Sequence, residues 1–267
     1  MATKNAVKKA IKRNALRING QFADTGIWVK DGDLIELVDP QIKPPKEFDL
    51  EIPIVYDDEF LAAVYKPSGL VVSGNQHRTL TNALVGKLKE SNEPDAYQWG
   101  HPVHRLDAAT SGLVLVAKTA KAQRGLGKLF ENRSINKTYH AVVQGVPESQ
   151  QIKLPVKDQT ACSQLNFIES VDSLRNGKLS LIQLQPKTGR THQLRIHCAE
   201  IGCPIVGDKL YGKAGEIMNH KGLFLAATRL EFGHPITDVA MDISIPIPHK
   251  FEALLRREQR RWDGKNV

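Results

Sequence analysis

Short apolar runs bounded by glycine, proline or polar residues recur along most of the chain, a pattern typical of buried strands. They predict strands at residues 60–65, 113–117, 139–143 and 179–185. Apolar residues spaced three or four apart predict helices at 79–90, at 120–132, around 194–201, and near the C-terminus from residue 251, where a basic tail (256–261) follows. Because strands and helices mix without regular alternation, the pattern favours an α+β fold.

The first 38 residues have a different character. A lysine-rich helix is predicted at 5–16, with short strands near Leu16, at 27–29 and at 34–38, and no acidic residue precedes Asp24. Prolines then mark a linker. The predicted organisation is therefore a small unit at 1–38, a linker at 39–49 and a main domain at 50–267. The basic helix is either a phosphate-contacting surface or a solvated charged face; the predicted RNA contacts are Lys8, Lys9, Lys12 and Arg13.

The composition changes this picture only in part. The 267-residue chain has a net charge of +8, which favours a polyanionic partner such as nucleic acid over a merely basic protein, without excluding the latter. Three cysteines without a Cys-x-x-Cys pair predict neither a disulfide framework nor a zinc ribbon, and this usage fits a reducing cytoplasm. No apolar run approaches membrane-spanning length, and the N-terminus lacks the apolar core of a signal peptide.

One acidic residue, Asp107, lies in a short segment with histidines and an arginine. Asp107 lies in the segment 101–112, with His104 and Arg105 just before it and a Ser-Gly pair just after it. Nearby positive charge favours the ionised form of an aspartate, and an ionised carboxylate at a strand end can act as a nucleophile or a base. The alternative is a structural ion pair that caps a turn.

A second segment, 185–197, is cationic and has no local acid. Arg190 stands at the entrance of a predicted helix, and His192 and Arg195, three residues apart, share one helix face. The cluster must find its counter-charge in Asp107 or in a bound phosphate, unless it is simply an exposed basic face.

Two other chemistries fit less well. A hydrolytic metal could in principle take ligands from His101, His104, Asp107, His192 and His197, but the spacing matches no familiar ligand pattern and the arginines would repel a cation. Glycoside hydrolysis normally needs two carboxylates, and only one acid lies in these segments.

Four segments in order resemble the RluA family of RNA pseudouridine synthases over about residues 50–255. The matching residues are Lys66 to Leu70; His104 to Asp107 with Thr110 to Gly112; Lys137 to Tyr139 with 141–145; and Thr188 to His197 with Gly202 to Pro204 and Gly207 to Gly212. The first unit resembles the latter part of an S4 RNA-binding domain. The chain departs from the family at Tyr65, where asparagine is common, and at the pair Ala108-Ala109, which is usually more polar.

The resemblance implies a pseudouridine synthase fold with a mixed, mainly antiparallel sheet flanked by helices. It implies isomerisation of uridine in ribosomal or transfer RNA by a cytoplasmic monomer without metal or organic cofactor. The implied catalytic residues are Asp107, Tyr139 and Arg190, with Arg190 paired to Asp107. The implied substrate-binding residues are His104, Arg105, Lys137, His192, Leu194 and Arg195. A non-catalytic RNA-binding or RNA-chaperone protein with the same fold is the alternative, and a metal-dependent phosphodiesterase is a third hypothesis.

Overall fold

The computed structural model describes residues 3–37, 44–212 and 222–265. The chain forms two compact units, Met1–Pro44 and Pro45–Val267, so the division falls inside the proline-bearing segment. No helix in these described ranges is both long and apolar enough to span a bilayer.

The first unit consists of one helix and a small antiparallel sheet. Helix α1 (Lys4–Lys12) is followed by β1 (Leu16–Ile18), β2 (Gln21–Phe22) and β3 (Ile35–Leu37), in the sheet order β2-β1-β3. The strand expected at 27–29 is wrong, because β2 and β3 already occupy both edges of β1. The side chains of Lys8, Lys9, Lys12 and Arg13 are exposed.

The second unit is built on one ten-stranded sheet. Its strands are β4 (Ile54–Asp57), β5 (Leu61–Lys66), β6 (Ala96–Pro102), β7 (Ser111–Thr119), β8 (Asn136–Gln144), β9 (Gln150–Ile152), β10 (Ser163–Ser173), β11 (Gly177–Pro186), β12 (Leu225–Gly233) and β13 (Ala240–Ser244). Its helices are α2 (Leu80–Ala83), α3 (Ala120–Glu131), α4 (Gln193–Glu200) and α5 (His249–Asp263).

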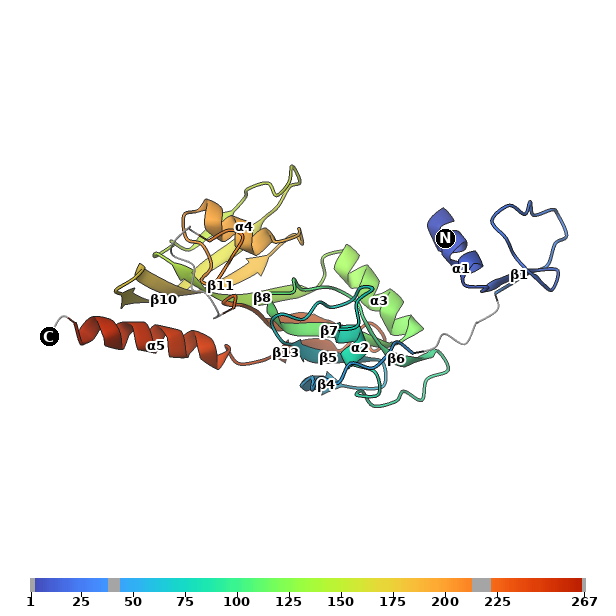
Figure 1. Ribbon diagram of the computed structural model, residues 1–267, viewed down its shortest axis with the longest axis horizontal. Helices are drawn as coiled ribbons and strands as arrows, with labels where there is room; N and C mark the ends of the chain where they lie inside the picture. The colour runs from blue at the N-terminus through green and yellow to red at the C-terminus, as the bar shows by residue number, and fades with distance from the viewer. Residues whose placement is uncertain (1–2, 38–43, 213–221, 266–267) are drawn as a thin grey trace. The chain divides into compact units, whose positions relative to one another are not determined.

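The sheet is mixed and mainly antiparallel. Its main path runs β4-β5-β7-β12-β8-β11-β10-β9, with β6 paired to β7 and β13 paired to β12. The pair β7–β12 is parallel and the other strand pairs are antiparallel. Helix α5 runs alongside β10, where Ser173 donates a hydrogen bond to Glu258 (Figure 1). This arrangement confirms the predicted α+β class.

The predicted strands are confirmed as β5, β7, β8 and β11, and the helix at 120–132 as α3. The long helix expected at 79–90 is wrong, since α2 ends at Ala83. Gly86 lies at φ +68°, a left-handed conformation that interrupts an α-helix. Leu80 and Leu84 are nevertheless buried, so the four-residue spacing of these leucines reflects their packing in the core and not a continuous helix.

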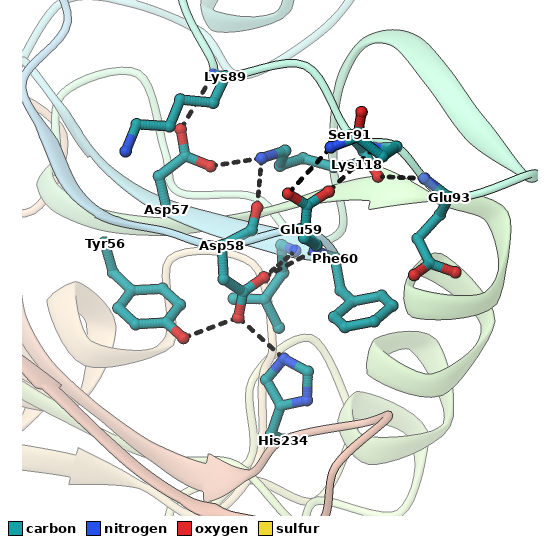
Figure 2. A network of polar contacts seen from close by, with 12 residues as sticks. Tyr56, Asp57, Asp58, Glu59, Phe60, Lys89, Ser91, Glu93, Lys118 and His234 are labelled. Atoms are coloured by element: carbon teal, nitrogen blue, oxygen red, sulfur yellow. Dashed lines mark hydrogen bonds and ion pairs between the residues drawn. The ribbon is translucent and has the colours of Figure 1, made fainter.

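A polar cluster fastens the end of β7 that carries Lys118 (Figure 2). The Lys118 ammonium donates to Asp57 at 2.7 Å, with both side chains almost fully buried. Asp58 accepts hydrogen bonds from the Tyr56 hydroxyl at 2.7 Å and from His234 Nε2 at 3.1 Å. These contacts join the β4–β5 turn to β7 and to the end of β12. They fix the sheet at the Lys118 end of β7 and so support the other end of the strand, which begins at Ser111.

Candidate active site

Three strands meet where the loop that carries Asp107 enters the sheet. At this end of β7, Ser111 lies opposite Ala226 of β12, and Ala227 lies opposite Tyr139 of β8. The residues of the 104–107 segment and Tyr139, far apart in the sequence, are therefore neighbours in space.

Glycine is required where these strands approach. Gly112 has φ +119°, and a Cβ there would collide with the Ala227 carbonyl oxygen and lie 2.5 Å from the Ala227 nitrogen. Only glycine allows this conformation and this approach together.

A cavity of about 320 Å³ lies at this junction. All nine residues predicted to form the catalytic and substrate-binding site line it: His104, Arg105, Asp107, Lys137, Tyr139, Arg190, His192, Leu194 and Arg195. The two dense sequence segments therefore share one site.

The Asp107 carboxylate faces two basic side chains of the second segment. His192 Nε2 lies 3.7 Å from Oδ1, and Arg195 Nη1 lies 3.8 Å from Oδ2. The Asp107 side chain is 19% exposed and that of Arg195 only 6%. A partly exposed carboxylate beside a buried guanidinium can reach a ligand in the cavity while staying oriented.

The predicted pairing of Arg190 with Asp107 is wrong. The guanidinium of Arg190 donates from Nε to the Thr160 carbonyl oxygen at 3.3 Å, and the arginine within ion-pair distance of Asp107 is Arg195. The reason lies in the backbone: Arg190 precedes the left-handed His192 at which α4 begins, whereas Arg195 lies in the first turn of the helix.

Arg195 is held from behind by a second aspartate. Its Nε and Nη2 each donate to the Asp208 carboxylate at 2.7 Å, and the guanidinium lies 5.1 Å from the centre of the Tyr211 ring. Asp208 also accepts the backbone N–H groups of Leu210 and Tyr211. These bonds lower the pKa of Asp208 against the opposing effect of burial, and the bidentate geometry aims Nη1 at Asp107.

His192 completes this arrangement. Its backbone has φ +59°, unusual for a residue other than glycine, and its ring contacts the Tyr211 hydroxyl through Nδ1 at 3.0 Å. The turn directs Nε2 towards Asp107. Asp208 and Tyr211 were missed as site residues, although both lie in the Gly207 to Gly212 segment that carried the resemblance.

A buried lysine anchors the loop that carries Asp107. Lys66 Nζ donates to the carbonyl oxygens of Pro67, Leu70 and Ala108 at 2.9, 2.7 and 3.2 Å. Burial lowers the pKa of Lys66 to about 8, while the nearby Asp107 carboxylate acts in the opposite direction. Lys66 was missed as a site residue; its signal was a lone lysine at the end of an apolar strand.

The positive surroundings of Asp107 have a different source from the one the sequence suggested. Burial lowers the pKa of His104 to about 3, and its Nε2 accepts the Leu115 N–H at 2.9 Å, so the ring is neutral. His101 stacks against Tyr97 instead of facing Asp107. The positive charge beside Asp107 comes from Arg195. Lys66 adds to it from behind the loop that carries Asp107.

Tyr139 lines the cavity. Burial, and next the Asp107 charge, raise the pKa of its hydroxyl above the usual range, so the phenol stays protonated. Lys137, two residues away on the same strand, lies 5.9 Å from the centre of the Phe130 ring. A partly buried aromatic ring with a neutral hydroxyl suits contact with a planar, uncharged ring.

The histidines considered for a metal do not converge. His197 bonds the Leu154 carbonyl oxygen, away from His101 and His104. Among the residues that the structure describes, no group of three or more His, Cys, Asp or Glu side chains is arranged to hold a metal ion.

The pocket combines an oriented carboxylate, a buried arginine and a protonated tyrosine, a set that can perform nucleophilic or acid–base chemistry. Residues 61–200 match the sequence model of the family described as RNA pseudouridylate synthase. The chain belongs to this family and is an RNA pseudouridine synthase, which converts uridine in RNA to pseudouridine. The predicted RluA-family resemblance is confirmed, and the enzyme is favoured over a non-catalytic RNA-binding protein.

Relatives and solved structures agree with this assignment. The chain is 35% identical to ribosomal large subunit pseudouridine synthase D of Zymomonas mobilis, over 83% of the chain and 77% of the relative. It is 30% identical to ribosomal large subunit pseudouridine synthase C of Rickettsia felis, over 94% of the chain and 90% of the relative. The structure of human RNA pseudouridylate synthase domain containing 4 shares the fold, with a TM-score of 0.63 and 24% identity over 77% of this chain and 92% of that one.

Proposed function

We propose that this enzyme isomerises uridine in the RNA of the large ribosomal subunit. The proposal rests on the relatives whose names specify that substrate and which align over most of both chains. The positive net charge favours a polyanionic partner of this kind.

The proposed chemistry centres on the Asp107 carboxylate, and the observation that carries it is its placement 3.8 Å from the buried Arg195. Asp107 acts on the ribose of a flipped-out uridine, either by attacking C1′ or by removing the C2′ proton. The N1–C1′ bond breaks, the uracil rotates, and a C5–C1′ bond forms. The C5 proton is lost and N1 gains one, so the product is an isomer and no co-reactant is consumed.

The other residues of the cavity position the base. Tyr139 lies against the uracil, and its hydroxyl relays the C5 proton late in the reaction. Leu194 closes the other side of the ring, and Arg105 occupies the space that the extruded base leaves. His192 and Arg195 hold the carboxylate in position, while Lys137, His104 and Arg190 shape the wall of the cavity.

We also propose that the first unit is a shortened S4-like module that contacts RNA phosphates through Lys8, Lys9, Lys12 and Arg13. The proposal also includes a cytoplasmic monomer that acts without a protein partner and without a metal or organic cofactor, as the family resemblance implies.

The test is a comparison of pseudouridine in RNA from cells with and without the protein. We expect at least one uridine of the large-subunit RNA to lose its modification in the deletion strain and to regain it on expression of the intact protein. Loss confined to transfer RNA would refute the ribosomal assignment while leaving the chemistry in place.

A further inference from the structure

Strand β6 carries three aromatic side chains at alternate positions. Tyr97, Trp99 and His101 are all partly exposed. The rings of Tyr97 and His101 are stacked, with centroids 3.9 Å apart and an interplanar angle of 9°, and the rings of Trp99 and His101 are 5.3 Å apart at 28°. These contacts join the three rings into a single cluster.

A bulge in the strand gathers these rings. Ala96 pairs with Thr119 and His101 with Ala117, so the segment between the two pairings is longer on β6 than on β7. In a regular strand, residues four apart are separated by about 13 Å, yet the rings of Tyr97 and His101 are in contact. Bulges that re-aim side chains are common beside active sites.

Gly100, between Trp99 and His101, packs against the protein interior. A Cβ at Gly100 would lie 2.6 Å from side-chain atoms of both Leu88 and Val116. Trp99 and His101, its neighbours in the chain, are partly exposed, and Tyr97 donates a hydrogen bond to Gln123 of α3.

The strand that carries the ring cluster leads into the catalytic cavity. Val103, two residues beyond His101 and about 7 Å along the chain, lines the cavity together with Phe130 of α3. Cations accompany it: Arg105 is exposed at the cavity wall, and α3 exposes Lys121, Arg124 and Lys128. Aromatic rings beside cations are the usual composition of surfaces that bind unpaired nucleic acid.

We propose that Tyr97, Trp99 and His101 form a stacking surface for unpaired nucleotides that flank the target uridine. The proposal rests on the proposed function, because extruding a uridine unstacks its neighbours and leaves their faces to be covered. Burial lowers the pKa of His101, which keeps its ring uncharged at neutral pH and suited to stacking.

The test uses the full-length protein and a fluorescein-labelled single-stranded oligouridylate of about 12 nucleotides, within the length such surfaces cover. Trp99→Leu removes the aromatic face but keeps an apolar side chain, and Trp99→Phe keeps the aromatic face. Fluorescence anisotropy should show binding weakened by roughly 5-fold to 100-fold in Trp99→Leu, with Trp99→Phe much closer to the wild type. The control variant is Phe167→Leu. Phe167 is an exposed aromatic residue on β10, several strands away from β6 in the sheet, so this variant should bind as the wild type does.

An abasic RNA of the same length separates stacking from charge. Trp99→Leu and the wild type should bind it equally, because it has no bases to stack. Three results would overturn the proposal: unchanged oligouridylate binding in Trp99→Leu, equal losses in Trp99→Phe and Trp99→Leu, or an equal loss on abasic RNA. A lower melting temperature of Trp99→Leu with unchanged RNA affinity would instead assign the rings to internal packing.

Failure of this proposal is distinguishable from failure of the proposed function. If the wild type forms no pseudouridine in large-subunit RNA, the proposed function fails whatever the oligouridylate result. If the wild type is active and Trp99→Leu leaves KM for that RNA unchanged, the stacking surface alone is refuted.

Discussion

Asp208 accepts two hydrogen bonds of 2.7 Å from Nε and Nη2 of Arg195, and the third guanidinium nitrogen, Nη1, lies 3.8 Å from Oδ2 of Asp107. The Asp107 carboxylate is thus oriented by an arginine that is itself oriented by a second, fully buried carboxylate. This chain of contacts makes Arg195 a better partner for Asp107 than Arg190.

Exchanging each arginine for lysine tests that choice. Arg195→Lys keeps the charge but loses the two-pronged contact with Asp208, so we expect kcat to fall by about 100-fold through misplacement of Asp107. Arg190→Lys should cause a much smaller loss, because its recorded hydrogen bond is to the Thr160 carbonyl. Single-turnover rates on the same RNA measure both. A larger loss in Arg190→Lys than in Arg195→Lys would instead support the pairing of Arg190 with Asp107 that the sequence suggested.

The close approach at Gly112 predicts a large loss of stability on substitution. Gly112→Ala combines a forbidden φ with collision against the Ala227 backbone, so we expect the free energy of unfolding to fall by about 3 kcal/mol or more. Gly127→Ala is the matched control: it lies in α3 with open space around its Cβ, so it should stabilise by roughly 0.5–1 kcal/mol. Denaturant unfolding measures both, and equal effects would contradict the strained geometry.

The buried Lys66 predicts a distinctive pH dependence. Its folded pKa of about 8 lies below its usual value of 10.5, so between these pH values the unfolded chain binds more protons than the folded one. Stability due to this group therefore rises with pH across that window, by up to about 1.4 kcal/mol per pH unit. Below pH 8 the contribution is constant.

The control for Lys66 is Lys66→Met, which cannot titrate. The difference in unfolding free energy between wild type and variant should increase in favour of the wild type from pH 8 to pH 10.5. A difference independent of pH in this window would mean that Lys66 keeps its ordinary pKa.

The basic helix α1 predicts a change in salt dependence. Replacing Lys8, Lys9, Lys12 and Arg13 by glutamine should reduce the slope of log K for RNA against log salt by up to about 3, or roughly 0.7 for each lost phosphate contact with single-stranded RNA. The comparison is Lys153→Gln with Lys157→Gln, two exposed lysines of the larger unit. An unchanged slope in the α1 variant would show a solvated helix face.

The sequence predicted the parts of the fold that rest on strong apolar runs. Strands β7 and β8 were identified because Leu113 to Ala117 and Ala141 to Val143 are continuous and buried. Strand β10 was missed because its apolar residues do not alternate regularly: Phe167 and Ile168 are adjacent, at the irregularity where the pairing with β11 shifts register. The parallel pairing of β7 with β12 also could not be predicted, since it depends on long-range topology rather than local pattern.

The residues of the site, too, could be predicted only in part. Nine of the residues that line the cavity could be predicted, because the motif segments keep chemistry-bearing side chains close together in sequence. The partner of Asp107 could not, because the choice between Arg190 and Arg195 depends on one left-handed residue, His192, that sets where α4 begins. Local spacing does not reveal a single backbone torsion.

The most direct test of the account is pseudouridine formation by Asp107→Asn. The substitution keeps the size of the side chain and removes the charge, so the protein should fold with a melting temperature near that of the wild type. Incubated with RNA from cells lacking the protein, the wild type should form pseudouridine and Asp107→Asn should form none detectable by nucleoside mass spectrometry. A folded Asp107→Asn protein that forms pseudouridine at a rate near the wild type would contradict the central role given to this carboxylate.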